Sequence, residues 1–150
     1  MPVVLSSRLR RRRLQLSRLQ SLAETILREA GATRADLSLL LVGDRSMRRL
    51  NRVYRGKDRT TDVLAFPMRK VSPRVTRHGS PVTSKLLGDI VISLPQAARQ
   101  AARAGHRLDR EVAVLVIHGL LHLLGYDHER NVREARRMQR KERAILRAIG

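Results

Sequence analysis

The strongest constraint on the fold lies near the C-terminal end, in the eleven residues HGLLHLLGYDH that run from His118 to His128. This segment holds three of the five histidines of the chain. On a helix, His118 and His122 are four residues apart and lie on one face, about one turn from each other. Gly125 can end such a helix in a left-handed conformation and turn His128 back toward the pair. The segment therefore predicts a helix followed by a glycine corner, with three imidazoles at one point.

A metal site is the chemistry that this spacing favours. The chain has no cysteine, so a metal ion would be held by nitrogen or oxygen. The spacing H-x3-H-x2-G-x2-H is that of the metzincin metalloproteases without their glutamate. Three neutral imidazoles plus a water are typical of catalytic zinc, because a structural site normally has a fourth protein ligand. We therefore predict one Zn²⁺ per chain, held by His118, His122 and His128; histidines collected by chance would rarely show this spacing.

Gly119 bears on the reaction, because it stands where H-E-x-x-H enzymes carry the glutamate that acts as general base. Its missing side chain makes the usual route of peptide hydrolysis unfavourable. Phosphodiester cleavage mainly needs a polarised water or phosphate oxygen and cations that stabilise developing charge. Arg55, Lys57 and Arg59 offer such cations. Asp127 either orients a ligand histidine or forms a turn.

The charge of the chain points to a polyanionic partner. Its 150 residues, enough for one domain, carry 32 Lys and Arg against 13 Asp and Glu, a formal net charge of +19. Codon usage is an alternative cause, because arginine greatly outnumbers lysine. With one Phe and two Tyr, a base-stacking platform is not expected, so a nucleic acid would bind through its backbone. No apolar run long enough for a membrane span or secretory signal is recognised, so we expect a cytoplasmic protein with no membrane partner.

The hydrophobic pattern predicts four strands and five helices. The strands are expected at Val3–Leu5, Leu37–Val42, Val63–Phe66 and Gly88–Ser93. The helices are expected from Leu16 to Gly31, from Asp44 or Ser46 to Gly56, from Pro95 to Gly105, from Asp109 through the histidine pair, and from Asn131 to Ile149. The β-branched run Val112–Ile117 would pass for a strand by itself, but the histidine spacing makes sense only on a helix.

Several local features complete this pattern. Three helices have expected N-terminal caps. These are Asp44 or Ser46 for the second helix, Asp109 for the fourth, and Asn131 with Glu134 for the last. Glu142 falls on the inward stripe of the last helix, where we expect it to meet an arginine. Residues 69–85 show no hydrophobic period and are expected to form a long loop. The basic segment Arg8–Arg13 is either a solvated tail or a contact with nucleic acid or the ribosome.

The motifs resemble those of the YbeY family of endoribonucleases, from about Leu16 to Ile149. The signature H-G-x-L-H-L-x-G-Y-D-H is complete, and further matching blocks are Leu50-Asn51, Tyr54–Asp58, Thr61–Leu64, Phe66-Pro67, Gly88–Ile90, Met138 and Glu142. Ala65 departs from the usual serine of the family, and Thr60 from its common proline. The pattern and the resemblance imply an α+β (α/β-like) fold: a single mixed, mostly parallel four-stranded sheet packed with about five helices and a zincin-like metal helix. Residues 1–15 would be a basic segment with a short strand, and residues 16–150 a single domain.

The resemblance also implies a function. It implies a zinc-dependent, single-strand-specific endoribonuclease that acts in 3′-end maturation of small-subunit (16S) rRNA and in ribosome quality control. The expected partners are single-stranded RNA, the small ribosomal subunit and its assembly factors. Arg55 corresponds to the family's functionally important arginine, a contact to phosphate or to the transition state; alternatively it bonds carbonyls at the end of its helix. Lys57 and Arg59 are expected to bind substrate.

Two other functions remain open from the residues alone. One is a metallohydrolase that acts on another substrate. The other is a ribosome-assembly or RNA-binding factor in which zinc mainly holds the last two helices together.

Overall fold

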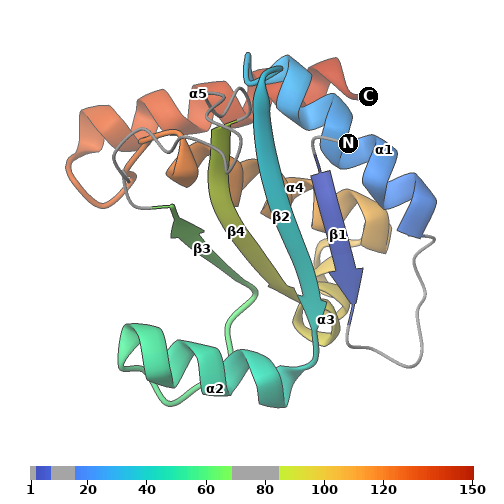
Figure 1. Ribbon diagram of the computed structural model, residues 1–150, viewed down its shortest axis with the longest axis vertical. Coiled ribbons are helices and arrows are strands. Elements are labelled where there is room, and N and C mark those ends of the chain that lie inside the picture. The colour runs from blue at the N-terminus through green and yellow to red at the C-terminus, as the bar shows by residue number, and fades with distance from the viewer. Residues whose placement is uncertain (1–2, 8–15, 69–84) are drawn as a thin grey trace, which may run out of the picture.

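A four-stranded mixed sheet forms the centre of the molecule (Figure 1). The computed structural model describes residues 3–7, 16–68 and 85–150. In the order β1-β2-β4-β3, the strands β1 (Val3–Ser7), β2 (Ala35–Val42) and β4 (Lys85–Ser93) are parallel. Strand β3 (Val63–Pro67) pairs antiparallel with β4 and forms an edge of the sheet. The mostly parallel sheet that the sequence predicts is confirmed.

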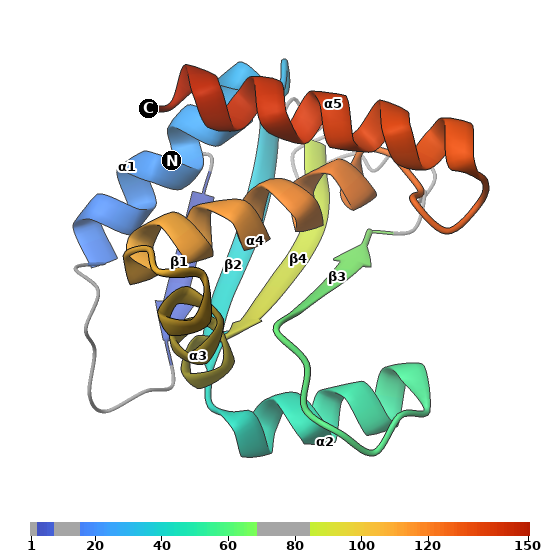
Figure 2. The same cartoon turned by 180° about the vertical axis from the view of Figure 1, so that it is seen from behind.

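Five helices surround this sheet, as expected: α1 (Leu16–Glu29), α2 (Asp44–Arg55), α3 (Leu94–Ala104), α4 (Leu108–Leu123) and α5 (Val132–Ala148). Four of them cover one face, with α4 lying across the strands and α5 running alongside it (Figure 2). Helix α2 lies apart from them, at the end of the molecule where β2 and β4 finish (Figure 1). No helix in the described part of the chain is long and apolar enough to cross a membrane.

Alternation along the strands divides the core into two parts. Leu39 and Ile90 belong to the large cluster under α1, α4 and α5, whereas Leu40 and Val91 join the smaller cluster under α2. Successive strand residues point to opposite faces, so the C-terminal halves of β2 and β4 are packed on both faces, whereas Val4 and Ser6 leave the second face of β1 exposed. Such strands read as continuous apolar runs, as LSLLLV does in β2.

Helix α4 is the central helix of the domain. Seven of its apolar side chains are buried, on nearly all sides of the helix: Val112, Ala113, Leu115, Val116, Ile117, Leu120 and Leu121. A helix enclosed in this way is stabilised mainly by burial of its side chains. Packing therefore overrides the strand propensity of the β-branched run, and the expected buried helix is confirmed.

The structure corrects several element boundaries and caps. The N-cap of α2 is Gly43 instead of Asp44 or Ser46, and that of α4 is Arg107 instead of Asp109, in both cases without a side-chain cap. Asn131 does cap α5, because its side chain accepts a hydrogen bond from the Glu134 amide. Strand β4 begins at Lys85, earlier than expected. The predicted loop up to residue 84 and the basic segment Arg8–Arg13 lie outside the described residues.

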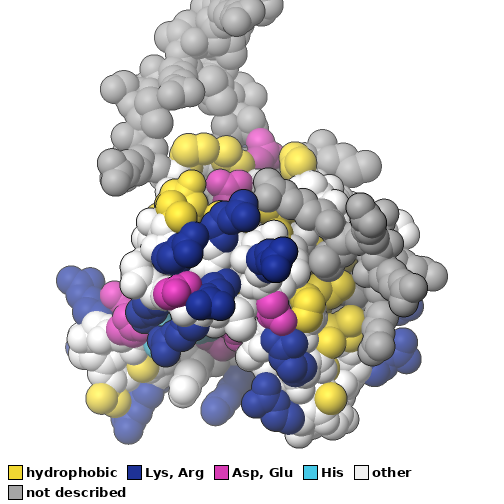
Figure 3. Space-filling view, turned by 90° about the horizontal axis from the view of Figure 1, so that it is seen from below, with side chains coloured by type: hydrophobic (Ala, Val, Ile, Leu, Met, Phe, Trp, Pro, Cys, Tyr) yellow, Lys and Arg dark blue, Asp and Glu magenta, His cyan; other side chains and the backbone are white. Residues whose placement is uncertain are grey.

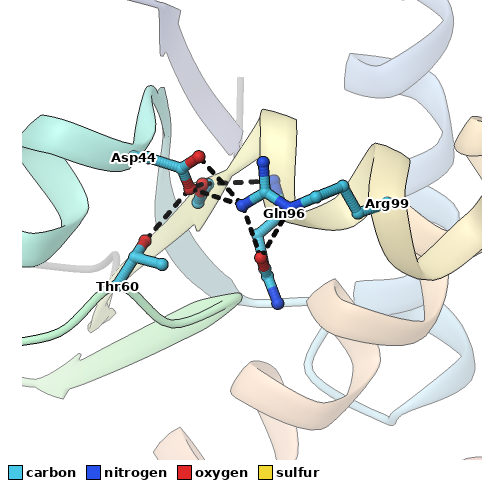
Figure 4. Close-up of polar contacts among 5 residues, drawn as sticks. Asp44, Thr60, Gln96 and Arg99 are labelled. Carbon is cyan, nitrogen blue, oxygen red and sulfur yellow. Dashed lines mark hydrogen bonds and ion pairs between the residues drawn. The ribbon is translucent and has the colours of Figure 1, made fainter.

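Asp44 has a tertiary role instead of a capping role. Its carboxylate accepts hydrogen bonds from Thr60, Ser93 and Arg99, which belong to three different segments (Figure 4). Burial alone would raise the pKa of this carboxyl, but hydrogen bonds from Arg99, Ser93 and Thr60 outweigh that effect and lower the pKa below its ordinary value. The ionised carboxylate thus ties the start of α2 to the β4–α3 corner and to the segment after α2.

Candidate metal centre and cleft

The three histidines of the signature meet at one point. His118 and His122 lie on the last turns of α4, and His128 lies in the segment between α4 and α5. The three ring centroids are 4.6 to 5.2 Å apart. One nitrogen of each ring lies within 4.8 Å of the other two, so the group could hold a metal ion.

The hydrogen bonds of the rings point the free nitrogens at each other. His118 Nδ1 contacts a carboxylate oxygen of Glu142 at 3.2 Å, and His122 Nδ1 contacts the Tyr126 carbonyl at 3.1 Å. Because both acceptors are oxygens, a neutral ring at either position would carry its proton on Nδ1 and turn the lone pair of Nε2 toward the other ring. The two Nε2 atoms are 3.1 Å apart, close to the roughly 3.3 Å separation of two imidazole ligands in tetrahedral zinc. Two Nε2 atoms at this distance either share a proton in a hydrogen bond or ligate one cation, and the donor set of three imidazoles fits a metal.

The glycine corner forms as predicted. Gly125 has φ +101°, in the left-handed region that favours glycine. Its amide donates to the His122 carbonyl, and the Tyr126 amide donates to the Leu121 carbonyl, which is a Schellman motif. This turn ends α4, places the Tyr126 carbonyl on the His122 ring and returns the chain toward His128.

The partner of Glu142 differs from the prediction. Instead of an arginine, its carboxylate contacts the ring of His118. Glu142 and His118 come from neighbouring helices, α5 and α4, which pack against each other. A carboxylate behind a ligand histidine fixes the ring orientation and raises the basicity of the other nitrogen. Helical periodicity places Glu142 on the inward face of α5 but does not reveal which side chain it will meet.

The surroundings of His122 favour the neutral form of its ring. Burial lowers its pKa, and the neighbouring rings of His118 and His128 lower it further, against an opposing hydrogen bond from the ring to the Tyr126 carbonyl. Neutral imidazole is the form that binds a metal ion. The surroundings of His122 therefore favour the form of the ring that can bind a metal ion.

The histidines open into a cleft with a volume of about 750 Å³. The half-buried side of α4 that carries Val114, His118 and His122 lines it, together with edge strand β3. Arg55, Lys57 and Arg59 also line it, so the cations expected from the sequence lie in the same cavity as the histidines. Their side chains are exposed. The sequence placed Asn51 in a matching block but gave it no role; this buried residue donates a hydrogen bond to the Arg59 carbonyl at 2.9 Å and so positions the segment that follows α2.

Asp127 also lines the cleft, and its contact is that of a turn former. Its carboxylate accepts a hydrogen bond from the Glu129 amide at 2.9 Å. The task of orienting ligand rings is met by Glu142 for His118 and by the Tyr126 carbonyl for His122.

Gly119 lacks a side chain for a reason of packing. A Cβ atom built at this position would lie 3.1 Å from two carbon atoms of Ile90 on β4. Ile90 is fully buried, so little space exists for it to move away. The close approach of α4 to the sheet thus disfavours a side chain such as the glutamate that a metzincin carries here, because Ile90 would have to shift to make room for it.

Glu142→Gln is expected to weaken zinc binding by about 10- to 100-fold, because an amide is a poorer partner than a carboxylate for the proton on His118 Nδ1. Competition with a fluorescent zinc chelator measures this change. Glu29→Gln, the same substitution at the exposed end of α1, is the matched control and should keep the wild-type affinity. Equal affinities in both variants would show that Glu142 does not support the site.

Comparisons with known proteins agree with this architecture. The family model described as endoribonuclease YbeY matches residues 5–150. An endoribonuclease YbeY from Moorella thermoacetica is 48% identical over 122 residues, which are 81% of this chain and 78% of the relative. One from an Anaeromyxobacter species is 47% identical over 150 residues, 100% of this chain and 73% of the relative.

A solved structure supports the fold independently. The solution structure of a Thermotoga maritima protein has a TM-score of 0.66 at 24% sequence identity. The match covers 98% of this chain and 88% of the other. At this identity, the likeness bears on the fold alone.

Proposed function

Because the chain belongs to the YbeY family of endoribonucleases, we propose that it is a zinc-dependent endoribonuclease that cleaves single-stranded RNA. Its biological substrate would be the 3′ end of small-subunit (16S) rRNA, and it would act in the cytoplasm in rRNA maturation and ribosome quality control. The proposed partners are the small ribosomal subunit and its assembly factors.

One observation carries this proposal: a single cleft holds both the three-histidine group and the three exposed cations Arg55, Lys57 and Arg59. Three histidines leave a coordination position open, as in catalytic zinc sites. The cations suit a substrate that carries negative charge along its backbone. The cleft therefore combines a site for hydrolytic chemistry with a surface for phosphate.

The histidines and cations of the cleft would have separate tasks. His118, His122 and His128 would hold the zinc, which would supply Lewis acidity toward a phosphoryl oxygen or a water. Glu142 and the Tyr126 carbonyl hold the rings of His118 and His122 in the orientation that ligation needs. Arg55 would donate hydrogen bonds from its planar guanidinium to phosphate oxygens, where negative charge grows during cleavage. Lys57 and Arg59 would neutralise the phosphates on either side.

A structural role for the metal is the second candidate, and the position of the ligands favours it. Two ligands come from α4 and the third from the segment that leads to α5, while Glu142 of α5 supports one of them. An ion here would therefore fasten the last two helices together. In an assembly factor of this kind, metal removal would lower the melting temperature, but rRNA processing would survive a ligand mutation.

Side-by-side substrates test the proposed function. The zinc-loaded protein should cleave single-stranded RNA and leave DNA of the same sequence and an unstructured peptide intact. Chelation of the metal should abolish cleavage, and added zinc should restore it. Cleavage of the peptide or of DNA at a similar rate would favour another metallohydrolase, and undiminished RNA cleavage after complete chelation would remove the metal from the reaction.

A further inference from the structure

The exposed face of α2 carries a stripe of arginines that no task in the cleft explains. Arg45, Arg48, Arg49 and Arg52 recur at intervals of three and four residues, so they share one side of the helix. All four side chains are exposed, whereas Met47 and Asn51 on the opposite side are buried. Lys and Arg side chains gather over the end of the molecule to which α2 belongs (Figure 3).

Two hollows connect this stripe with the metal cleft. Arg59 lines the cleft and also a hollow of about 490 Å³ beside it, which Arg45 and Arg48 line too. Arg45 and Arg48 also line the second of these hollows, of about 400 Å³, together with Arg49 and Arg52. Because consecutive hollows share lining residues, they lie next to each other from the metal centre to the outer side of α2.

Most of the charge along this surface is uncompensated. Asp58 pairs with Arg48, with one contact at 2.8 Å, and Asp44 is occupied by Arg99. Within the described residues, no carboxylate lies within ion-pair distance of Arg45, Arg49 or Arg52. The hydrogen bonds and ion pairs of Asp44 and Asp58 hold the helix and the following segment in place. Asp58 also attracts Arg52 from beyond ion-pair distance, but the guanidinium groups of Arg45, Arg49 and Arg52 form no ion pair among the described residues.

We propose that the outer face of α2 is a second RNA-binding surface, over which the single-stranded RNA substrate runs before it enters the metal cleft. Arg45, Arg49 and Arg52 bind its phosphates, whatever the base sequence. Guanidinium groups suit this task because they stay charged and can bind a phosphate through two hydrogen bonds. The proposal rests on the proposed function, since it assigns that enzyme a longer substrate contact.

The test compares two triple variants of equal charge. The first, Arg45→Gln with Arg49→Gln and Arg52→Gln, removes the stripe. The second, Arg136→Gln with Arg140→Gln and Arg143→Gln, removes three exposed arginines of α5 that do not line the cleft. Each variant loses three positive charges on one helix, so a general effect of net charge would be the same in both. Circular dichroism and zinc content establish that both are folded and loaded.

The readout is the affinity for single-stranded RNA of two lengths as a function of salt. For an oligonucleotide of about twelve nucleotides, the α2 variant should bind at least about tenfold more weakly at low salt, and its slope of log affinity against log salt should fall by about 2, since each phosphate contact of a single strand contributes about 0.7. Its affinity for a trinucleotide, which fills only the cleft, should change less than about twofold. The α5 variant should bind both RNAs like the wild type.

Other results would overturn the proposal. Equal losses in the two triple variants would show a general charge effect, and an unchanged salt slope in the α2 variant would show that RNA does not use this face. If poly-glutamate binds the wild type as tightly as the longer RNA and loses affinity only in the α2 variant, the face is a dock for an acidic protein. Failure of the proposed function looks different: the wild type would bind RNA but not cleave it.

Discussion

His122→Ala is expected to reduce bound zinc from about one ion per chain to less than about a tenth of that. Its ring supplies the Nε2 atom that faces His118 Nε2 at 3.1 Å, and alanine leaves two ligands, too few for a stable site. RNA cleavage should be lost with the metal, and the melting temperature should fall toward that of the chelated wild type. Metal analysis of the dialysed protein measures the first effect, and thermal unfolding with and without chelator measures the second.

His106 provides the control for this experiment. It pairs with Glu111 at 2.9 Å and does not line the cleft, so His106→Gln removes one histidine and should keep the full zinc content. His118→Ala should behave like His122→Ala. Full metal occupancy in both alanine variants would refute the assignment of the ligands, whatever their activity.

Arg55→Ala is expected to lower the turnover of single-stranded RNA by about 100-fold or more, which is the usual loss when a donor to a developing negative charge is removed. Zinc content and melting temperature should stay at wild-type values, because the exposed guanidinium lines the cleft but has no contact with the histidine group. The measurement is single-turnover cleavage at saturating enzyme, with metal content determined on the same samples.

The capping alternative for Arg55 makes a different prediction. The end of α2 is already closed by Gly56, whose amide donates to the Arg52 carbonyl, and by Lys57, whose amide donates to the Asn51 carbonyl. Among the described residues, no hydrogen bond from the Arg55 side chain to a carbonyl is formed. A variant that is unstable but turns over normally would support capping, and unchanged turnover in a stable variant would remove Arg55 from the mechanism. Arg55→Lys keeps the charge but not the planar group of paired N–H donors, so its cleavage rate should lie between those of Arg55→Ala and the wild type.

The parts of this site that the sequence predicted depend on local geometry. The spacing of His118 and His122 places both on one face of a helix, and Gly125 comes where that helix can end. The helix, the glycine corner and the group of three histidines could therefore be predicted from the sequence. The contact between Glu142 and His118 could not be predicted in this way, because it depends on the rotation of α5 against α4. Likewise, Asp44 is of a residue type that often caps helices, but its carboxylate instead accepts hydrogen bonds from three tertiary donors.

The cleft could not be predicted either, because the residues that line it are far apart in the sequence. Arg55 and His118 share a cavity because β3 pairs antiparallel at the edge of the sheet, beside β4, and brings the end of α2 to the half-buried side of α4. The charge of Arg55 and the histidine motif singled out both residues, but these features do not predict the order of the strands in the sheet. The role of Asn51 was not predicted for a related reason: a polar residue on the inner stripe of a helix shows that a partner exists but does not identify it.

The contact between Gly119 and Ile90 has a consequence for the evolution of this scaffold. A mutation that places a carboxylate at position 119 brings a Cβ atom against Ile90 before the carboxylate can act. A chain of this kind therefore acquires the general base of a peptidase only at a cost in core packing, because Ile90 must shift by a few tenths of an ångström or become smaller. Replacing Ile90 by a smaller residue costs about 1 kcal/mol or more in the core. Libraries that vary both positions together should therefore yield more stable chains with the Gly119→Glu substitution than libraries that vary position 119 alone. The spacing between one helix and one strand thus puts a packing cost on the change from one hydrolytic chemistry to the other.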